Sequence, residues 1–545
     1  MIRAAWFLMT LASAAVAASP ESGYLGSQAC FGCHAEIYQS YRKTPMGRSL
    51  RPATDLEKVN GLTSAQAKPA ASDGSVARVF QENSDWFQTD RRGQGLSETE
   101  KLDYLVGSGE NGFTPLVRRE QGLFQAPLSY YSRTGTWDWS PGYEQRDLGF
   151  SRQVPEECIV CHSGRAAPIT GRKNLYADPP FHELAIGCEN CHGPGEQHVR
   201  TPKRYRSIVN PRKLSPRLAE NICMSCHQGG DVRVLQPGRD YLDYRPGEWL
   251  VDTVAIFKAP AKLGEKSEAD LLEHNAAMKM SRCFRASNGK LSCLTCHDPH
   301  VQPDRGASVG YFRQKCYVCH TDESCTLPKR TRMSQTPPDN CIGCHMPKRD
   351  VAVISHTALT NHRIPARIGE PVPISLQESG NDLVLLNPAE GRGTAIPDVS
   401  LLRAYGEIAV RDPAYQNRYL ELLNQLVSRG SKEPLVEAAM GHKLLAGGKA
   451  DEALPHLSLG LALKETAVYE DMAKALSHLG REEEALEYME RASKADPFNA
   501  LVLKTLTLEY IKLKRYPEAK GQMERYVELF PQDQFMRSLL ARVTN

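Results

Sequence analysis

The sequence lacks the features that would direct a protein to nucleic acid or hold it in a membrane. Its 67 Lys and Arg residues nearly balance its 64 Asp and Glu residues, so the formal net charge is only +3. A charge this small gives no reason to expect a nucleic-acid partner. After the first residues, no apolar run is long enough to cross a bilayer. Aromatic residues make up only 7% of the chain, although an apolar content of 41% still permits a core.

Residues 1–18 have the features of a signal peptide. Arg3 supplies a short positive region, residues 4–16 are apolar, and small residues suit cleavage near Ala18. The alternative is an uncleaved anchor, but the apolar run is short for a membrane span. We therefore expect an exported protein, periplasmic or otherwise outside the cytoplasm, with no transmembrane segment after cleavage.

Cysteine, by contrast, is abundant and regularly placed. Of the 16 cysteines, 14 fall in seven Cys-x-x-Cys-His motifs, and every Cys-x-x-Cys in the chain is followed by histidine. This motif is typical of c-type haem attachment, in which two thioether bonds hold the ring and the histidine ligates its iron. Zinc ribbons, redox-active pairs and disulfides do not require that histidine. The sequence therefore predicts seven covalent c-type haems, attached to Cys30, Cys33, Cys158, Cys161, Cys188, Cys191, Cys223, Cys226, Cys293, Cys296, Cys316, Cys319, Cys341 and Cys344.

The motif histidines are the predicted proximal iron ligands: His34, His162, His192, His227, His297, His320 and His345. A distal ligand must approach each iron from the other face of the ring. The candidates outside the C-terminal repeats are His182, His198, His274, His300, His356 and His362. His300 follows His297 by three residues, so both point to one side, and His300 is expected to serve a neighbouring haem unless it is simply solvated. Such sharing implies closely packed haems, the arrangement that electron transfer needs.

The motifs fall within a predicted haem domain, residues 19–365, which contains a β-rich insertion at residues 75–150. Apolar and polar residues alternate in the insertion between Gly and Pro, as in strands and turns. A formal GxGxxG at residues 107–112 is not followed by a helix start, so an ordinary turn is expected. Trp137 and Trp139 either pack in the core or line a pocket.

The C-terminal third of the chain has no cysteine and is expected to be helical. Residues 366–412 resemble a linker containing one helix, and residues 413–545 contain three similar segments. Ala453, Ala485 and Ala519 recur at spacings of 32 and 34 residues, which predicts tetratricopeptide repeats. An unrelated helical bundle is the alternative. The predicted fold class is mainly α, with an irregular haem-packed domain, its β-rich insertion and an all-α solenoid.

Three segments carry a resemblance to a known family: "CENCHGPGEQH", "LSCLTCHDPH" and "CIGCHMPKR" with "HTALTNHRI". They resemble the doubled-CXXCH multihaem cytochromes c, which are similar to the tetrahaem cytochromes c of ammonia oxidisers. The chain more closely resembles exported bacterial proteins in which such a domain is fused to tetratricopeptide repeats. The resemblance implies electron transfer, sometimes attached to nitrogen- or sulfur-compound redox chemistry. It also implies that histidines like His198 and His300 are distal ligands to other haems.

The sequence departs from this family after its first motif. Relatives often carry a histidine where this chain has Thr44-Pro45-Met46-Gly47. Met46 is therefore a further distal candidate, which would give a His/Met haem of raised potential. The other two possibilities are an open iron beside His34 and completion of the site by another residue.

Two cysteines, Cys283 and Cys325, lie outside the motifs. In an exported protein, a disulfide between them is the simplest expectation. It would close a loop that contains two haem motifs and stabilise it by about 4 kcal/mol in the chain-entropy model. A cysteine-ligated haem or two free thiols are the alternatives.

Together these features predict a cytochrome that transfers single electrons along a packed haem chain, with redox partner proteins and a repeat domain for protein docking. One alternative is an oxidoreductase that acts on a small nitrogen or sulfur compound at one open haem. Another is an assembly scaffold, in which the repeats carry the main function. The first predicts that every iron is six-coordinate, and the second predicts a vacant iron, most simply beside His34.

Overall fold

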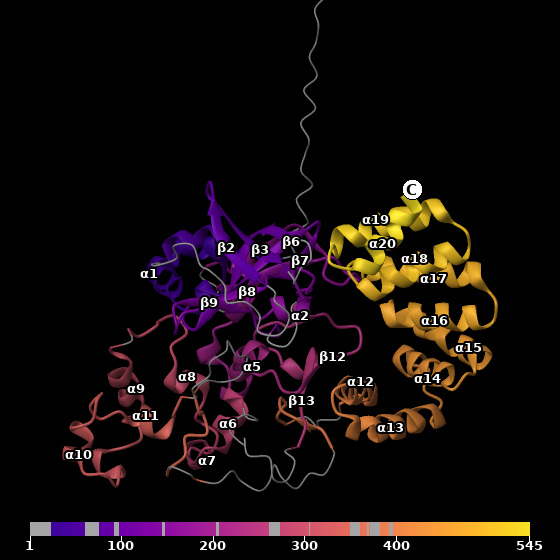
Figure 1. The fold of residues 1–545 in the computed structure, drawn as a ribbon. Coiled ribbons are helices and arrows are strands. Elements are labelled where there is room, and N and C mark those ends of the chain that lie inside the picture. Colours follow the sequence, from indigo (N-terminus) through magenta and orange to yellow (C-terminus); the bar gives the residue numbers. More distant parts are fainter. Residues whose placement is uncertain are drawn as a thin grey trace, which may run out of the picture.

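The structure is a computed structural model that describes residues 23–59, 76–91, 97–143, 148–202, 207–260, 273–304, 306–348, 360–367, 370, 382–391 and 396–544. The predicted signal peptide and His356 lie outside these ranges. Figure 1 shows an N-terminal part built from strands and short helices, beside which a C-terminal arc of paired helices is stacked. Within the described ranges, every helix is too short or too polar to span a membrane.

Antiparallel strands form the upper half of the N-terminal part. One sheet has the order β1-β5-β6-β8-β9 with β7 paired to β6, and β2-β3-β4 form another. The strand prediction for residues 75–150 is confirmed, and the GxGxxG segment is a turn between β5 and β6 in which Gly107 and Gly109 have positive φ. The strands are β1 (Leu50–Pro52), β2 (Val76–Glu82), β3 (Asp85–Arg91), β4 (Ser97–Lys101), β5 (Tyr104–Val106), β6 (Gly112–Arg119), β7 (Gly122–Gln125), β8 (Leu128–Tyr131) and β9 (Thr136–Trp139).

Strand structure extends further along the chain than predicted. Two small antiparallel sheets follow, made of β10 with β11 and of β12, β13 and β14. Their strands are β10 (Ser163–Pro168), β11 (Tyr176–Ala185), β12 (Val232–Leu235), β13 (Val254–Lys258) and β14 (Val384–Leu385). The N-terminal part is therefore a mixed α and β structure rather than a mainly α domain with one β-rich insertion.

The helices of this part are short, and most of them carry or adjoin a Cys-x-x-Cys-His motif. They are α1 (Phe31–Tyr41), α2 (Glu156–Ile159), α3 (Glu189–His192), α4 (Glu196–Arg200), α5 (Pro216–His227), α6 (His274–Met280), α7 (Arg282–Ala286), α8 (Cys293–Cys296), α9 (Ser308–Cys316), α10 (Lys329–Met333) and α11 (Cys341–His345). Figure 1 places α9–α11 on the side of the molecule away from the helical arc.

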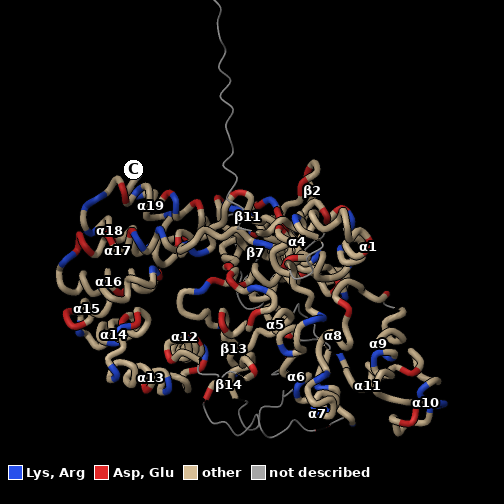
Figure 2. The backbone as a smooth tube through the Cα atoms, turned by 180° about the vertical axis from the view of Figure 1, so that it is seen from behind, with Lys and Arg blue, Asp and Glu red and all other residues tan. Residues whose placement is uncertain are grey.

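Longer amphipathic helices form the arc, which we call the repeat domain (α12–α20). Three antiparallel pairs, α14 with α15, α16 with α17 and α18 with α19, fall on the three similar sequence segments. Lys, Arg, Asp and Glu alternate along these helices without a patch of one sign (Figure 2). The helices are α12 (Asp398–Ala409), α13 (Gln416–Ser428), α14 (Pro434–Ala446), α15 (Ala450–Gly460), α16 (Thr466–His478), α17 (Glu482–Ala495), α18 (Ala500–Lys512), α19 (Tyr516–Leu529) and α20 (Gln534–Thr544).

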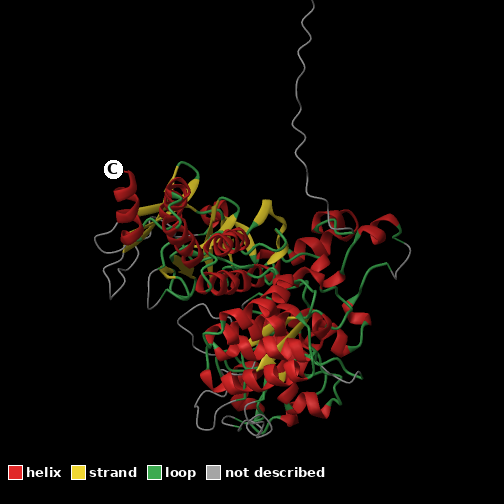
Figure 3. Ribbon diagram, turned by 90° about the vertical axis from the view of Figure 1, so that its right-hand side faces the viewer, coloured by secondary structure: helices red, strands yellow, loops and turns green. Residues whose placement is uncertain are grey.

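The first end of the repeat domain is anchored to the N-terminal part through α12. Tyr405 and Ile408 of α12 pack with Val232 and Phe257 of the β12–β13 sheet. Figure 3 shows this small group of strands among the helices, apart from the strands near the C-terminal helix. The predicted linker at residues 366–412 therefore contains packed structure where it is described, because α12 buries one apolar face on a sheet.

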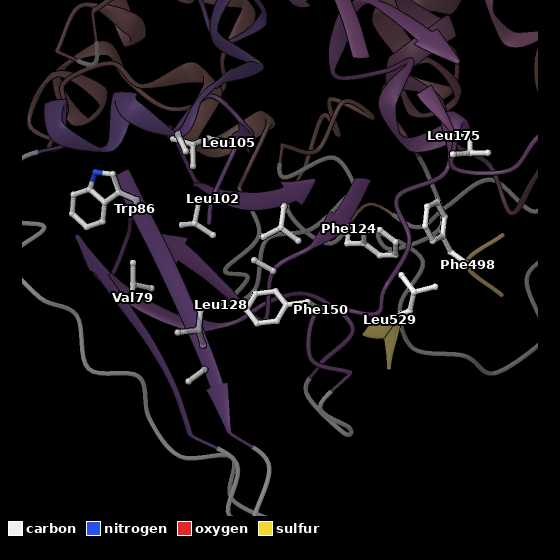
Figure 4. Packing of buried hydrophobic residues seen from close by; sticks show 14 of the residues in the cluster. Val79, Trp86, Leu102, Leu105, Phe124, Leu128, Phe150, Leu175, Phe498 and Leu529 are labelled. Carbon is white, nitrogen blue, oxygen red and sulfur yellow. The ribbon is translucent and has the colours of Figure 1, made fainter. Parts of the chain in front are cut away.

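The last helices of the repeat domain are anchored to the large sheet. Phe498 is 1% exposed and contacts Phe124 of β7 edge to face, with ring centroids 5.1 Å apart. Leu529 joins the same buried cluster (Figure 4). Arg119 of β6 also donates a hydrogen bond to the Leu529 carbonyl at 3.1 Å. The repeat domain is thus attached at both ends rather than tethered as a free arm.

Candidate functional site

The seven motifs lie on or beside short helices, which bring the two cysteines of a motif to one side. In the first motif, Cys30 caps α1, and the backbone leaves helical geometry at His34 (φ −122°, ψ 40°). In the fourth and seventh, the motif histidine is the last residue of α5 and of α11. All the cysteines have free thiols in the structure.

A haem iron takes two protein ligands, one from each face of the ring. Imidazole nitrogens bind such metals at about 2 Å, so the two imidazole centroids of a bis-histidine site lie roughly 6 Å apart. Paired histidines at this separation are therefore the arrangement to look for. Within the described residues, no three His, Cys, Asp or Glu side chains converge on one point as ligands of a bare metal ion would.

The first and third motifs each have a histidine pair of this kind. The ring centroids of His34 and His198 are 6.5 Å apart, with 17° between the ring planes. Those of His192 and His300 are 6.0 Å apart, with 9° between the planes. The expectation that His300 faces a histidine of another motif, rather than that of its own, agrees with this geometry.

The fourth and fifth motifs share a second group of four histidines. His297 and His362 have centroids 6.3 Å apart, at 31°. His227 and His274 are 5.6 Å apart at 72°, and His274 and His362 approach to 4.5 Å. This second group is more compact than the first, because one pair lies directly against the other.

Backbone carbonyls fix the orientation of three candidate ligands. Nδ1 of His192 donates to the Val209 carbonyl at 2.8 Å, and Nδ1 of His345 donates to the Pro365 carbonyl at the same distance. His362 makes the equivalent bond to its neighbour Thr360 at 2.9 Å. Because a carbonyl only accepts, Nδ1 must carry the proton, and a neutral ring then presents Nε2 as the free donor atom.

The buried imidazoles are also held in the neutral form, which is the form that binds a metal. Burial, reinforced by the neighbouring His362, lowers the pKa of His274 to about 3 and that of His297 to about 4. Burial likewise lowers the pKa of His192. None of these three rings carries a charge near pH 7.

Unpaired buried polar atoms lie close to several motifs, where the carboxylates of a haem could pair with them. The Tyr244 hydroxyl has no hydrogen-bond partner among the described residues, and the thiols of Cys223 and Cys191 act on its pKa, which burial raises. Nε and one Nη of Arg51 are unpaired among the same residues. Arg51 lies two residues beyond Ser49, whose hydroxyl donates to the His162 carbonyl. The donor set therefore fits an anionic group at these motifs.

Other candidates are not brought to a motif histidine. His182 is an exposed residue of β11. Met46 lies in a 3-10 turn, Met46–Arg48, while the ring that faces His34 is that of His198. Trp137 is 4% exposed and packs against Phe113 in the core, as one of the two predictions for it required.

The predicted Cys283–Cys325 disulfide is not formed in the structure, where both residues have free thiols. The thiol of Cys283 lies instead close enough to Cys296 and Cys319 for their charges to interact. The sequence pattern could not reveal this, because two leftover cysteines say nothing about which motif cysteines lie nearer in space.

The acid within the third motif was also missed as a positioning residue. Glu189 is 5% exposed, and its carboxylate accepts hydrogen bonds from the backbone N–H groups of Leu25, Gly26 and Gly195. It thereby holds the segment before the first motif against the third. The only signal in the sequence is its place between Cys188 and Cys191.

Comparisons with known proteins reach only the repeat domain. No family model matches the chain, and no curated protein matches it. A crystal structure of MamA is 13% identical, covers 27% of this chain and 80% of its own, and has a TM-score of 0.23. The second TPR domain of human RPAP3, solved with an HSP70 peptide, is 20% identical, covers 20% of this chain and 92% of its own, and has a TM-score of 0.18. At these scores the likeness carries no weight, and the description of the repeats depends on the helix pairs themselves.

Proposed function

We propose that the chain is an exported multihaem c-type cytochrome whose seven motifs hold covalent haems and pass single electrons between protein partners. The observation that carries the proposal is the pairing of motif histidines with histidines from elsewhere in the chain. His34 with His198, His192 with His300, and His297 with His362 are separated by 6.0 to 6.5 Å. A bis-histidine iron requires about this spacing.

A c-type haem supplies reversible one-electron chemistry at its iron. In this proposal the cysteines of each motif attach it, the motif histidine is the proximal ligand and the second histidine is the distal ligand. The carbonyls of Val209, Pro365 and Thr360 hold Nδ1 of their histidines so that Nε2 is directed to the metal. Buried donors such as the Tyr244 hydroxyl bind the propionate carboxylates.

For the first motif we assign His198, rather than Met46, as the distal ligand. The ring of His198 lies at the ligand spacing from His34, which argues against an open iron at this position. Substrate chemistry at the first motif, the form of the oxidoreductase alternative that the sequence favoured, therefore has no support from this geometry. Electron transfer without a bound substrate is the function we favour.

The repeat domain is the proposed docking element for a partner protein. Stacked helix pairs of this kind present an extended surface, and the solved RPAP3 domains bind HSP70 and HSP90 peptides. Because both ends of this repeat domain are anchored to the N-terminal part, a partner bound to it would be held in a fixed place relative to the motifs. No segment of the partner is specified by the charge pattern, in which both signs alternate (Figure 2).

The test is to produce the protein with its leader in a cell that attaches haem, count haems per chain, and record an electron paramagnetic resonance spectrum of the oxidised form. Seven haems and a purely low-spin spectrum, unchanged by nitrite, hydroxylamine or sulfite, are expected. Absence of covalent haem would overturn the proposal. A high-spin signal that shifts on addition of one of these compounds would support the oxidoreductase instead.

A further inference from the structure

The order of the motifs in space differs from their order in the sequence. The first motif lies against the third: the Ser27 hydroxyl accepts a hydrogen bond from the Cys188 backbone N–H at 2.8 Å, and Glu189 binds the N–H groups of Leu25 and Gly26. The Cys30 and Cys188 thiols also interact directly. The second motif, 128 residues from the first, is not part of this contact.

The second motif instead lies against the fourth. The Cys161 thiol donates to the Ser225 carbonyl at 3.7 Å, and Ser225 lies within the fourth motif between Cys223 and Cys226. Cys161 and Cys226 also form a side-chain hydrogen bond, which raises the pKa of the first and lowers that of the second. Two motifs separated by some 60 residues of chain thus share one contact.

The third, fourth and fifth motifs meet in the centre. His192 of the third pairs with His300, three residues after the fifth. Arg217, on the helix that ends in the fourth motif, donates to the carbonyls of Gly289 and Leu291, just before the fifth. The His227–His274 pair adjoins His362, which faces His297.

From the fifth motif the contacts continue in one direction only. The His297 ring meets Phe312 of α9 at 5.4 Å, and α9 ends at Cys316 of the sixth motif. The Tyr317 hydroxyl of the sixth motif then donates to Asp339 at 3.2 Å, two residues before the seventh. These helices form the lobe that Figure 1 places farthest from the repeat domain.

We propose that the seven motifs form a branched array with three ends, the first, second and seventh motifs, joined through a centre made of the third, fourth and fifth. This inference rests on the proposed function, because only bound haems would make the array an electron path. An electron that enters at any one end then has two alternative exits. The side branch through the second motif is the part that sequence order does not predict, since its neighbours along the chain are the first and third.

The test removes single attachment sites and follows the remaining haems by redox titration with electron paramagnetic resonance. Cys158→Ala with Cys161→Ala deletes the second site, and Cys341→Ala with Cys344→Ala deletes an end as a matched control. Each is expected to leave six haems and to shift the midpoint or g-values of one remaining haem. For the second-site variant, the shifted signal should be the one lost when Cys223 and Cys226 are replaced by alanine.

If that third variant does not accumulate, His274→Met marks the fourth haem by changing its potential while leaving both attachment cysteines in place. A shift that instead falls on the haem lost with Cys30 and Cys33, or with Cys188 and Cys191, would overturn the branched order. The haem count of the unaltered protein separates the two proposals: no covalent haem refutes the proposed function, whereas seven haems with another pattern of shifts refutes only the array.

Discussion

The lobe that carries the last three motifs and the repeat domain are built on opposite principles. From Arg282 to Lys348, no described apolar side chain is buried, and the buried side chains are the charged pair Arg332 and Asp339. In the repeat domain, Leu457, Leu476, Leu486 and many others are at most 2% exposed and form a continuous core. Ordering about 65 residues costs on the order of 100 kcal/mol in conformational entropy. The repeat domain offsets this cost by burying apolar surface, and the lobe has no comparable means within its own side chains.

The difference teaches why the cysteines and histidines are where they are. A lobe without a core needs a cofactor, a metal or covalent crosslinks to be stable. Three motifs in about 50 residues provide attachment for three large apolar rings, if the proposed function is right. The N-terminal part lies between the two extremes, since its sheets have a core of their own.

The largest expected effect comes from withholding the cofactor. If the full chain without residues 1–18 is made in a cytoplasm that does not attach haem, residues 282–348 should be unfolded while α14–α19 remain folded. Hydrogen exchange followed by mass spectrometry should show no protection in the lobe and at least ~100-fold slower exchange in the repeat helices. Equal protection of both regions in the haem-free protein would break the comparison and remove the main reason for cofactor dependence of the lobe.

The next effect contrasts truncation of a packed and an exposed apolar side chain. Phe498→Ala should cost about 3–5 kcal/mol, because Phe498 fills the contact between the repeat domain and β7 (Figure 4). Val318→Ala in the lobe should change stability by less than about 0.5 kcal/mol, since Val318 is 74% exposed. Urea unfolding followed by circular dichroism measures both.

A control for Phe498 lies on the following helix. Leu501→Ala removes an apolar side chain that is 66% exposed, so its unfolding midpoint should match that of the parent protein. A loss for Leu501→Ala as large as that for Phe498→Ala would mean that the substitution acts through the helix itself and not through the anchor.

How much of this could be predicted from the sequence depends on how local the signal is. The motif cysteines, the strands of residues 76–139 and the three helix pairs each follow from a short pattern or a repeat, and all are where they were expected. The partner of His34 and the position of α12 on a sheet are long-range contacts, which no local pattern specifies. Cys283 and Cys325 failed for the same reason, because their pairing depends on which thiols the fold brings together.

A smaller effect concerns single histidines in the two kinds of region. His300→Ala should convert one haem iron from low to high spin, because it removes the ring that faces His192 at 6.0 Å. His442→Ala in the repeat domain is the matched control and should leave all haem signals unchanged, since His442 pairs with Asp471 instead. Electron paramagnetic resonance distinguishes the two, and an unaltered low-spin spectrum for His300→Ala would refute the assignment of that ligand.

The smallest expected effect is a pH dependence of the repeat domain. A hydrogen bond from His442 to Asp471 raises the pKa of the imidazole above its ordinary value. A raised folded-state pKa stabilises the protein below pH ~6.5, the unfolded value, and this stabilisation is lost as the pH rises through the folded pKa. Because the His442 side chain is 65% exposed, less than about 1 kcal/mol is expected. The difference in unfolding free energy between the parent and His442→Gln should therefore be present at pH 5.5 and shrink by pH 8, and a difference that grows with pH would reverse the assigned sign.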